Sequence, residues 1–95
     1  MGQAPKTVYD CIRETMRVAV NENGIVEVSF CHHRGTPRRW QHIPASGFSK
    51  YVRSFDTIRA EELGIPREEL GNVIGLLYWA APVVNRVACR VQRRR

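Results

Sequence analysis

Side chains suited to a buried face recur every three or four residues over residues 6–20, which is the pattern of an amphipathic helix. These positions are Val8, Cys11, Ile12, Thr15, Met16 and Ala19. The pair Asn23-Gly24 follows, and such a pair commonly stops a helix at its C-terminal end. We therefore expect a first helix over residues 6–20.

The next segment alternates apolar and polar side chains, which predicts a β-hairpin. Residues 25–30 place polar side chains between β-branched or aromatic neighbours, as in a half-buried strand. A turn-like Arg-Gly-Thr-Pro sequence at 34–37 separates this strand from residues 38–43, which we expect to return as a second strand. The two faces of that strand would carry Trp40 and His42 on one side, and Arg39, Gln41 and Ile43 on the other.

Helical periodicity returns after Pro44. Ser46 can cap a second helix, and a third helix can begin at Pro66 after a left-handed helix end at Gly64. The apolar stripe of the second helix comprises Phe48, Tyr51, Val52, Phe55 and Ile58 or Arg59. The stripe of the third comprises Leu70, Val73, Ile74 and Leu77.

Pro82 interrupts the C-terminal apolar region, and a proline kinks or ends a helix. After it, an apolar stripe of helical spacing comprises Val83, Val84, Val87, Ala88 and Val91. We expect a fourth helix over residues 83–92 that ends in a basic tail. The alternative is a strand, because the segment is rich in valine and alternation would place Val87, Cys89 and Val91 on one side.

Together these elements predict an α+β fold in which a short antiparallel hairpin packs against three to four helices. A length of 95 residues and a hydrophobic fraction of 43% fit one globular core. We therefore expect a single domain over residues 1–95 with flexible tails at 1–5 and 92–95. We also expect Trp79 to be buried, with the alternative that Tyr78 and Trp79 lie at an interface. The other expected core residues are Phe30, Phe48, Phe55, Leu70, Ile74 and Leu77.

Cysteine usage and hydropathy indicate a cytoplasmic protein. The three cysteines are an odd number at no disulfide or metal spacing, and no signal peptide precedes them, which favours a reducing compartment. The apolar run over residues 73–84 is shorter than the about 20 residues that span a bilayer, so no membrane partner is expected. A core this small is often stabilised by pairing, so a homodimer or a complex is expected.

The net charge of +6 is unevenly distributed along the chain. Residues 31–53 and 73–95 each carry five basic and no acidic side chains, whereas residues 54–72 carry two basic and five acidic ones. Two basic segments therefore flank an acidic one. This distribution suits either binding of a polyanion or neutralisation across the folded surface.

The basic segments contain the candidate binding residues. Arginines next to an aromatic side chain combine phosphate donors with a plane on which a base can stack. The candidates are Arg34, Arg38, Arg39, Trp40, Lys50, Arg53, Arg90, Arg93 and Arg94. We therefore expect a non-enzymatic module that binds nucleic acid, or an acidic protein surface, through a basic hairpin and a C-terminal arm. A solvated turn with Trp40 packed inward is the structural alternative.

Residues 60–73 resemble the helix-turn-helix of bacterial and phage regulators. The resemblance rests on an alanine where two helices cross, a glycine in the turn and apolar residues that bury the second helix. These residues are Ala60, Gly64, Ile65, Leu70 and Val73. The resemblance to a helix-turn-helix implies a transcriptional regulator. The sequence departs from the helix-turn-helix pattern at Arg59, which replaces an apolar residue, and at Glu68 and Glu69, which would meet phosphate. The other interpretation is therefore an ordinary corner between two helices.

Two further classes of function find little support. Cys31-His32-His33 and His42 offer metal ligands, but no CxxC, HxH or HExxH spacing accompanies them, so we expect no metal and no cofactor. A cysteine beside a histidine lacks a recognisable orienting carboxylate, so no enzyme activity is expected. The remaining alternative is a small protein-binding inhibitor or adaptor from a phage or mobile element, similar in kind to anti-CRISPR proteins. It rests on the short chain without catalytic motifs.

Overall fold

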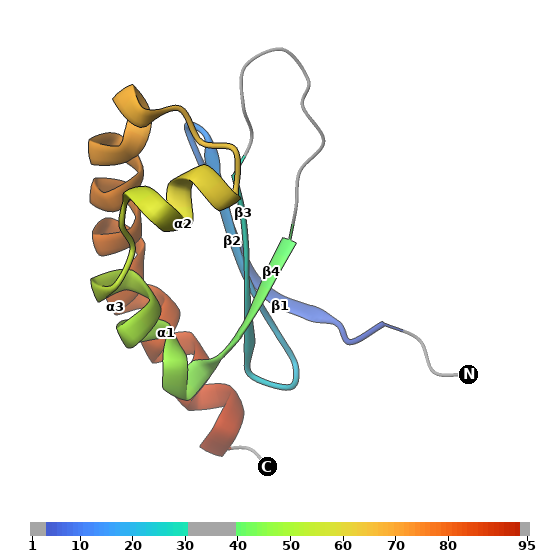
Figure 1. Ribbon diagram of the computed structural model, residues 1–95. Helices are drawn as coiled ribbons and strands as arrows, with labels where there is room; N and C mark the ends of the chain where they lie inside the picture. Colours follow the sequence, from blue (N-terminus) through green and yellow to red (C-terminus); the bar gives the residue numbers. More distant parts are fainter. Residues whose placement is uncertain (1–3, 31–39, 94–95) are drawn as a thin grey trace.

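The computed structural model describes residues 4–30 and 40–93, which form a four-stranded antiparallel sheet packed against helices on one face (Figure 1). The strands follow one another in space in their sequence order, from β1 to β4. Their bounds are β1 Thr7–Arg13, β2 Met16–Asn21, β3 Ile25–Phe30 and β4 Trp40–Pro44. The fold is therefore α+β, as expected, but its sheet is twice the size of the predicted hairpin.

The helix expected over residues 6–20 is wrong, because this segment forms the β1–β2 hairpin. Only Glu14 and Thr15 separate the two strands, and Glu14 adopts a positive φ of 52° in the turn. Met16, Val18 and Val20 alternate along β2 and are fully buried against the helices. Pairing of β2 with both neighbouring strands therefore outweighs the helical spacing, which Met16 alone of these three residues also satisfies.

The Asn23-Gly24 pair closes the β2–β3 hairpin instead of stopping a helix. The Asn21 side chain accepts hydrogen bonds from the backbone N–H groups of Asn23 and Ile25, at 2.9 and 3.1 Å. Gly24 has a φ of 79°, which a residue with a Cβ adopts only at a cost. The pair was predicted to end a helix, whereas it lies in the turn between two strands.

The predicted β3–β4 hairpin is confirmed in its described part. Val26 pairs with Ile43, and Val28 pairs with Gln41, so these four side chains face the helices. Trp40 and His42 lie on the opposite face, as expected. Residues 31–39 lie outside the described part of the chain, and so does the turn predicted at 34–37.

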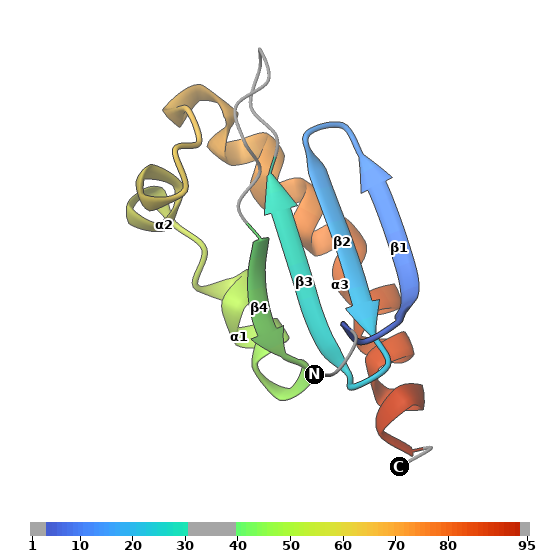
Figure 2. The same ribbon diagram turned by 90° about the vertical axis from the view of Figure 1, so that its right-hand side faces the viewer.

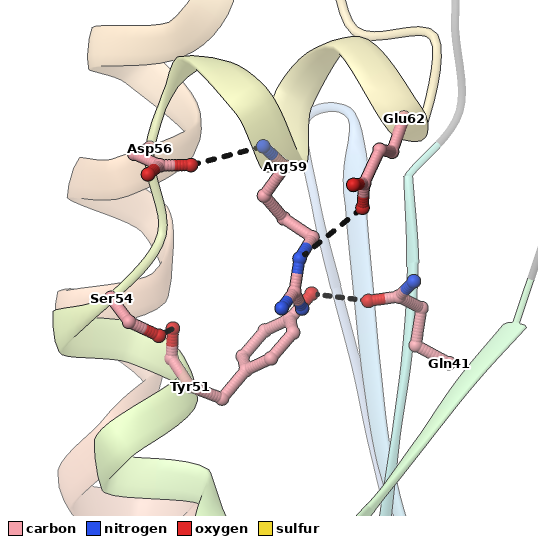
Figure 3. Close-up of polar contacts among 6 residues, drawn as sticks. All are labelled: Gln41, Tyr51, Ser54, Asp56, Arg59 and Glu62. Atoms are coloured by element: carbon pink, nitrogen blue, oxygen red, sulfur yellow. Dashed lines mark hydrogen bonds and ion pairs between the residues drawn. The ribbon is translucent and has the colours of Figure 1, made fainter.

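The second predicted helix is divided into α1, Ala45–Arg53, and α2, Thr57–Glu62. Asp56 caps α2 by accepting a hydrogen bond from the backbone N–H of Arg59 at 3.0 Å. Tyr51 ties α1 to the sheet, because its hydroxyl donates to Oε1 of Gln41 at 2.8 Å (Figure 3). The Arg59 guanidinium lies 5.2 Å from the centroid of the Tyr51 ring, which links α2 to the same corner.

The chain then turns at Gly64, whose φ of 74° confirms the expected left-handed helix end. A short 3-10 helix, η1 (Arg67–Glu69), leads into α3, Leu70–Arg93. Pro82 neither ends nor splits α3, and the strand considered for residues 83–91 is wrong. Pro82 lies on the exposed side of the helix, where a carbonyl left unpaired by the missing N–H can meet solvent.

The core lies between the sheet and the layer formed by α1 and α3. Of the expected core residues, Phe30, Phe48, Phe55 and Leu77 are buried, and Leu70 and Ile74 are partly buried against them. The expectation for Trp79 is wrong, because this side chain is 47% exposed at the edge of α3 where Arg13 of β1 contacts its ring. None of the described helices combines the length and the apolar character needed to cross a membrane.

Candidate nucleic-acid interface

One face of the sheet has no helix on it. In Figure 2 the four strands lie in front and α3 lies behind them, so the viewer looks onto this uncovered face. The strand register places Ile12, Arg17, Ser29 and Trp40 in one row across all four strands of this face. Asp10, Ala19, Glu27 and His42 form the neighbouring row. We call this surface the open sheet face.

Arg17 and Trp40 meet on the open sheet face although a strand separates their backbones. The guanidinium carbon of Arg17 lies 5.5 Å from the centroid of the Trp40 ring, within the range of a cation–π contact. Because Arg17 is on β2 and Trp40 on β4, the contact passes over β3. Trp40 nevertheless keeps 41% of its surface exposed.

Ser29 lies on β3 between these two side chains. It is completely buried, although none of the described helices covers its face of the sheet, and its hydroxyl oxygen has no hydrogen-bond partner among the described residues. A buried hydroxyl without a partner destabilises the folded state. The row therefore holds a cation, an aromatic plane and an unused hydrogen-bonding group beside one another.

An ion pair and a histidine–carboxylate contact also lie on the open sheet face. Arg17 donates two hydrogen bonds to the carboxylate of Asp10, at 2.6 and 3.0 Å, which lower the pKa of Asp10 and raise that of Arg17. On the other side, Nε2 of His42 lies 3.1 Å from Oε2 of Glu27. The Asp10 contact holds the Arg17 side chain extended along the sheet surface.

The open sheet face also exposes aliphatic surface. Ile12, opposite Arg17 in the register, is 61% exposed, and Val8 near the start of β1 is 49% exposed. A sheet face with exposed aromatic and aliphatic side chains beside a cation is suited to a ligand with flat apolar and anionic parts.

The structure divides the predicted site residues between two sides of the molecule. Trp40 lies on the open sheet face, so the alternative of an inward-packed Trp40 is wrong. Lys50 and Arg53 lie on α1, and Arg90 and Arg93 lie on α3, all on the helical side. Arg34, Arg38, Arg39 and Arg94 lie outside the described residues.

The helical side carries its own cluster of cations. Nδ2 of Asn85 donates to Oγ of Ser49 at 3.2 Å, which places the middle of α1 beside the C-terminal half of α3. Lys50 and Arg86 each follow directly after one member of this hydrogen-bonded pair. Among the described residues, no carboxylate pairs with the five cations of this cluster. They are Lys50, Arg53, Arg86, Arg90 and Arg93, and we call them the helical basic cluster.

The segment that resembles a helix-turn-helix forms the corner from α2 through η1 into α3. Ala60, Ile65 and Val73 are buried there, which fits the expected packing roles of these residues. α2 has only six residues, and α3 packs along the sheet through its buried side. The structure therefore assigns the buried residues of the corner to the core, and the resemblance to a regulator stays a prediction.

The cysteines and histidines contribute no described metal site. Within residues 4–30 and 40–93, no group of three or more potential ligands lies close enough to hold a metal ion. Cys11 is partly buried on β1, Cys89 is exposed on α3, and His42 contacts Glu27. Cys31, His32 and His33 lie outside the described residues.

Ile12, Arg17 and Ser29 lie on the open sheet face but were not predicted as site residues, and Ile12 was expected on the buried side of a helix. The signal that could have identified them is the alternation of Met16, Val18 and Val20 with Arg17 and Ala19, which is typical of a strand with one exposed face. No protein-family model matches the chain, and neither a curated protein nor a solved structure is similar to it by comparison.

Proposed function

We propose that the protein binds single-stranded nucleic acid across the open sheet face. The observation that carries the proposal is the pair of Trp40 and Arg17, in which an exposed aromatic ring and a guanidinium lie side by side on an uncovered sheet. A base can stack on the exposed part of the ring, and Nη1 of Arg17, which makes neither of the two hydrogen bonds to Asp10, can donate to a phosphate of the same strand.

The exposed aromatic ring favours a single strand over a duplex. In a duplex each base is stacked between its neighbours, so a side chain on a flat sheet cannot reach its face. In a single strand the bases are free to turn toward Trp40 and Ile12. The hydroxyl of Ser29, buried beneath Arg17 and Trp40, is then a hydrogen-bond partner for a base edge once these side chains shift.

Charge in the sequence supports the same surface. The two rows of this face carry one cation, Arg17, and two carboxylates, Asp10 and Glu27, so these described residues have no net positive charge of their own. Arg34, Arg38 and Arg39 lie in the segment that joins β3 to β4, and this segment contains no acidic residue. Attraction to phosphate requires cations, and in the sequence these arginines come shortly before Trp40.

The helical basic cluster is the competing surface for nucleic acid. Its cations have no described ion-pair partner and can contact phosphates of any strand. It lies on the other side of the sheet from Trp40, and among the described cation–π contacts none joins one of its cations to an aromatic ring. The two surfaces therefore predict different effects of the same substitutions.

Fluorescence anisotropy with a labelled oligothymidine strand, and with a duplex of equal length, tests the proposal. We expect the protein to bind the single strand more tightly than the duplex, with an affinity that falls as salt is raised. Trp40→Ala should lower the affinity about tenfold or more, since base stacking contributes about 1–3 kcal/mol per base. Arg17→Met should also weaken binding and reduce the salt dependence.

Lys50→Ala combined with Arg53→Ala is the matched control on the helical side, and it should change the affinity little. If this control weakens binding and Trp40→Ala does not, the helical basic cluster is the binding surface. If no variant changes binding, or the protein binds neither strand nor duplex, the nucleic-acid proposal fails. The protein-binding inhibitor or adaptor is then the function to pursue.

A further inference from the structure

A patch of three large apolar side chains near the middle of α3, on its outer side and along the edge next to β1, is left partly exposed by the described residues. Tyr78 is 54% exposed, Trp79 47% and Val83 38%, all near the middle of the helix. Arg13 of β1 lies with its guanidinium carbon 4.4 Å from the centroid of the Trp79 ring, which covers only one side of the patch. Exposed clusters of large apolar side chains commonly mark interaction surfaces.

Charges of opposite sign lie at the two ends of this patch. Toward the N-terminal end of α3, Glu61 and Glu68 are exposed on α2 and η1. Toward the C-terminal end, Arg86, Arg90 and Arg93 are exposed and have no described ion-pair partner. The surface of α3 therefore runs from acidic through apolar to basic.

Such a surface is complementary to itself when two copies lie antiparallel. Positions 71, 75, 78, 82, 86, 89 and 93 of α3 follow one another at three- and four-residue spacing, so they share one side of the helix, and Trp79, Val83 and Arg90 lie along one edge of that side. A two-fold axis near residues 78 and 79 would place Glu68 of one copy opposite Arg86 and Arg90 of the other. Antiparallel helices also bring opposite ends of their dipoles together.

We propose that a second copy of this chain docks on the outer side of α3, with the two α3 helices antiparallel. This interface is independent of the open sheet face, which would remain uncovered on both copies. α3 has 24 residues and is about 36 Å long, enough for a continuous helix–helix contact. Tyr78 and Trp79 form its apolar centre, and the charged ends set the antiparallel direction.

The glycines of this side fit the proposed contact. A Cβ added at Gly71 or Gly75 would meet nothing within 4 Å, so the packing of one chain does not require glycine at these positions. In the antiparallel pair, Gly75 lies opposite Pro82 of the second copy. A glycine there allows the two backbones to approach closely.

Sedimentation equilibrium of the full chain without nucleic acid, over a range from low micromolar to submillimolar concentration, tests the interface. We expect a monomer–dimer equilibrium. Gly75→Gln should fold as well as the natural chain, because the site is open and glutamine favours a helix more than glycine does. It should nevertheless shift the equilibrium to the monomer, because its side chain separates the two helices.

Charge reversal tests the direction of the pair. Glu68→Arg and Arg90→Glu should each raise the dimer dissociation constant about tenfold, and both together should restore it to within about threefold of the natural value. Lys50→Glu, an equivalent reversal on α1, should leave it unchanged. A chain that stays monomeric throughout, a dimer that survives Gly75→Gln, or a double reversal without recovery would each overturn the proposal.

Discussion

Ser29 on β3 and Trp40 on β4 are directly paired in the sheet register, yet Ser29 is completely buried while Trp40 is 41% exposed. The difference follows from Arg17, which pairs with Ser29 from the other side and extends to the Trp40 ring. The open sheet face therefore contains a buried polar group under a cation–π contact. The unpaired hydroxyl of Ser29 should therefore lower the stability of the folded protein.

Ser29→Ala should increase the free energy of unfolding by about 1 kcal/mol, because it removes a buried hydroxyl that has no hydrogen-bond partner. Urea unfolding at neutral pH provides the measurement. Ser54→Ala is the comparison, since the Ser54 hydroxyl donates to the backbone oxygen of Tyr51 at 3.4 Å, and its loss should be neutral or slightly destabilising. A Ser29→Ala variant less stable than the natural chain would show that the hydroxyl has a stabilising partner.

Tyr51 should make the protein sensitive to alkali. Burial raises its pKa to about 12, against the opposing effect of Arg59. The unfolded chain has a tyrosine pKa of about 10, so between pH 10 and 12 the unfolded state loses a proton that the folded state keeps. The stabilising contribution is therefore complete below pH 10 and is lost as the pH rises to about 12.

The size of this alkaline effect is roughly 3 kcal/mol, since each pKa unit corresponds to 1.36 kcal/mol. Urea unfolding at several values between pH 9 and 12 measures it. Tyr51→Phe keeps the ring but not the titrating group, so its stability should fall less steeply over the same range. Equal slopes for the two proteins would show that Tyr51 does not titrate differently in the folded state.

Two glycines should respond to alanine in opposite directions. Gly64→Ala should lower the free energy of unfolding by about 1–2 kcal/mol, because an L-residue is strained at a φ of 74°. Gly75→Ala should raise it by up to about 1 kcal/mol, because Gly75 lies within α3 and its added Cβ meets open space. Thermal unfolding at low protein concentration measures both. Destabilisation by Gly75→Ala there would mean that this glycine serves the fold of the single chain.

Truncation of Phe48 and truncation of Trp79 should lower the free energy of unfolding by different amounts. Phe48 is completely buried, so Phe48→Ala should lower the free energy of unfolding by about 3–5 kcal/mol. Trp79 is 47% exposed, so Trp79→Ala should lower it by less than about 2 kcal/mol. Chemical denaturation of both variants separates the cases, and similar losses would place Trp79 in the core after all.

Local chemistry was enough to identify several elements from the sequence. The alternation over residues 25–30 predicted β3, and the reversed faces of Trp40 and Ile43 followed from the same period of two. Gly64 was recognised as a left-handed helix end because glycine is the residue that adopts positive φ without strain. These features depend on residues close together in the chain, so the sequence contains their cause.

The structure of residues 6–20 depended on sheet pairing and on packing against α3, which lies far along the chain. These residues satisfy a helical and a strand period at once, and the difference was decided by hydrogen bonds from β2 to β3 and by burial of Met16, Val18 and Val20 under the helices. Pro82 was expected to kink or end a helix, because proline has no backbone N–H to donate. Its place on the exposed side of α3 allows the helix to continue.

The sequence alone determined that the chain has a basic character, an α+β composition of elements and a tryptophan among arginines. Only the tertiary structure decided which charges share a surface. It placed Trp40 beside Arg17 of a distant strand and separated it from Lys50, Arg53, Arg90 and Arg93 by the thickness of the sheet. The physical reason is that side-chain direction depends on strand register and on which helix face is buried, and both are set by long-range packing.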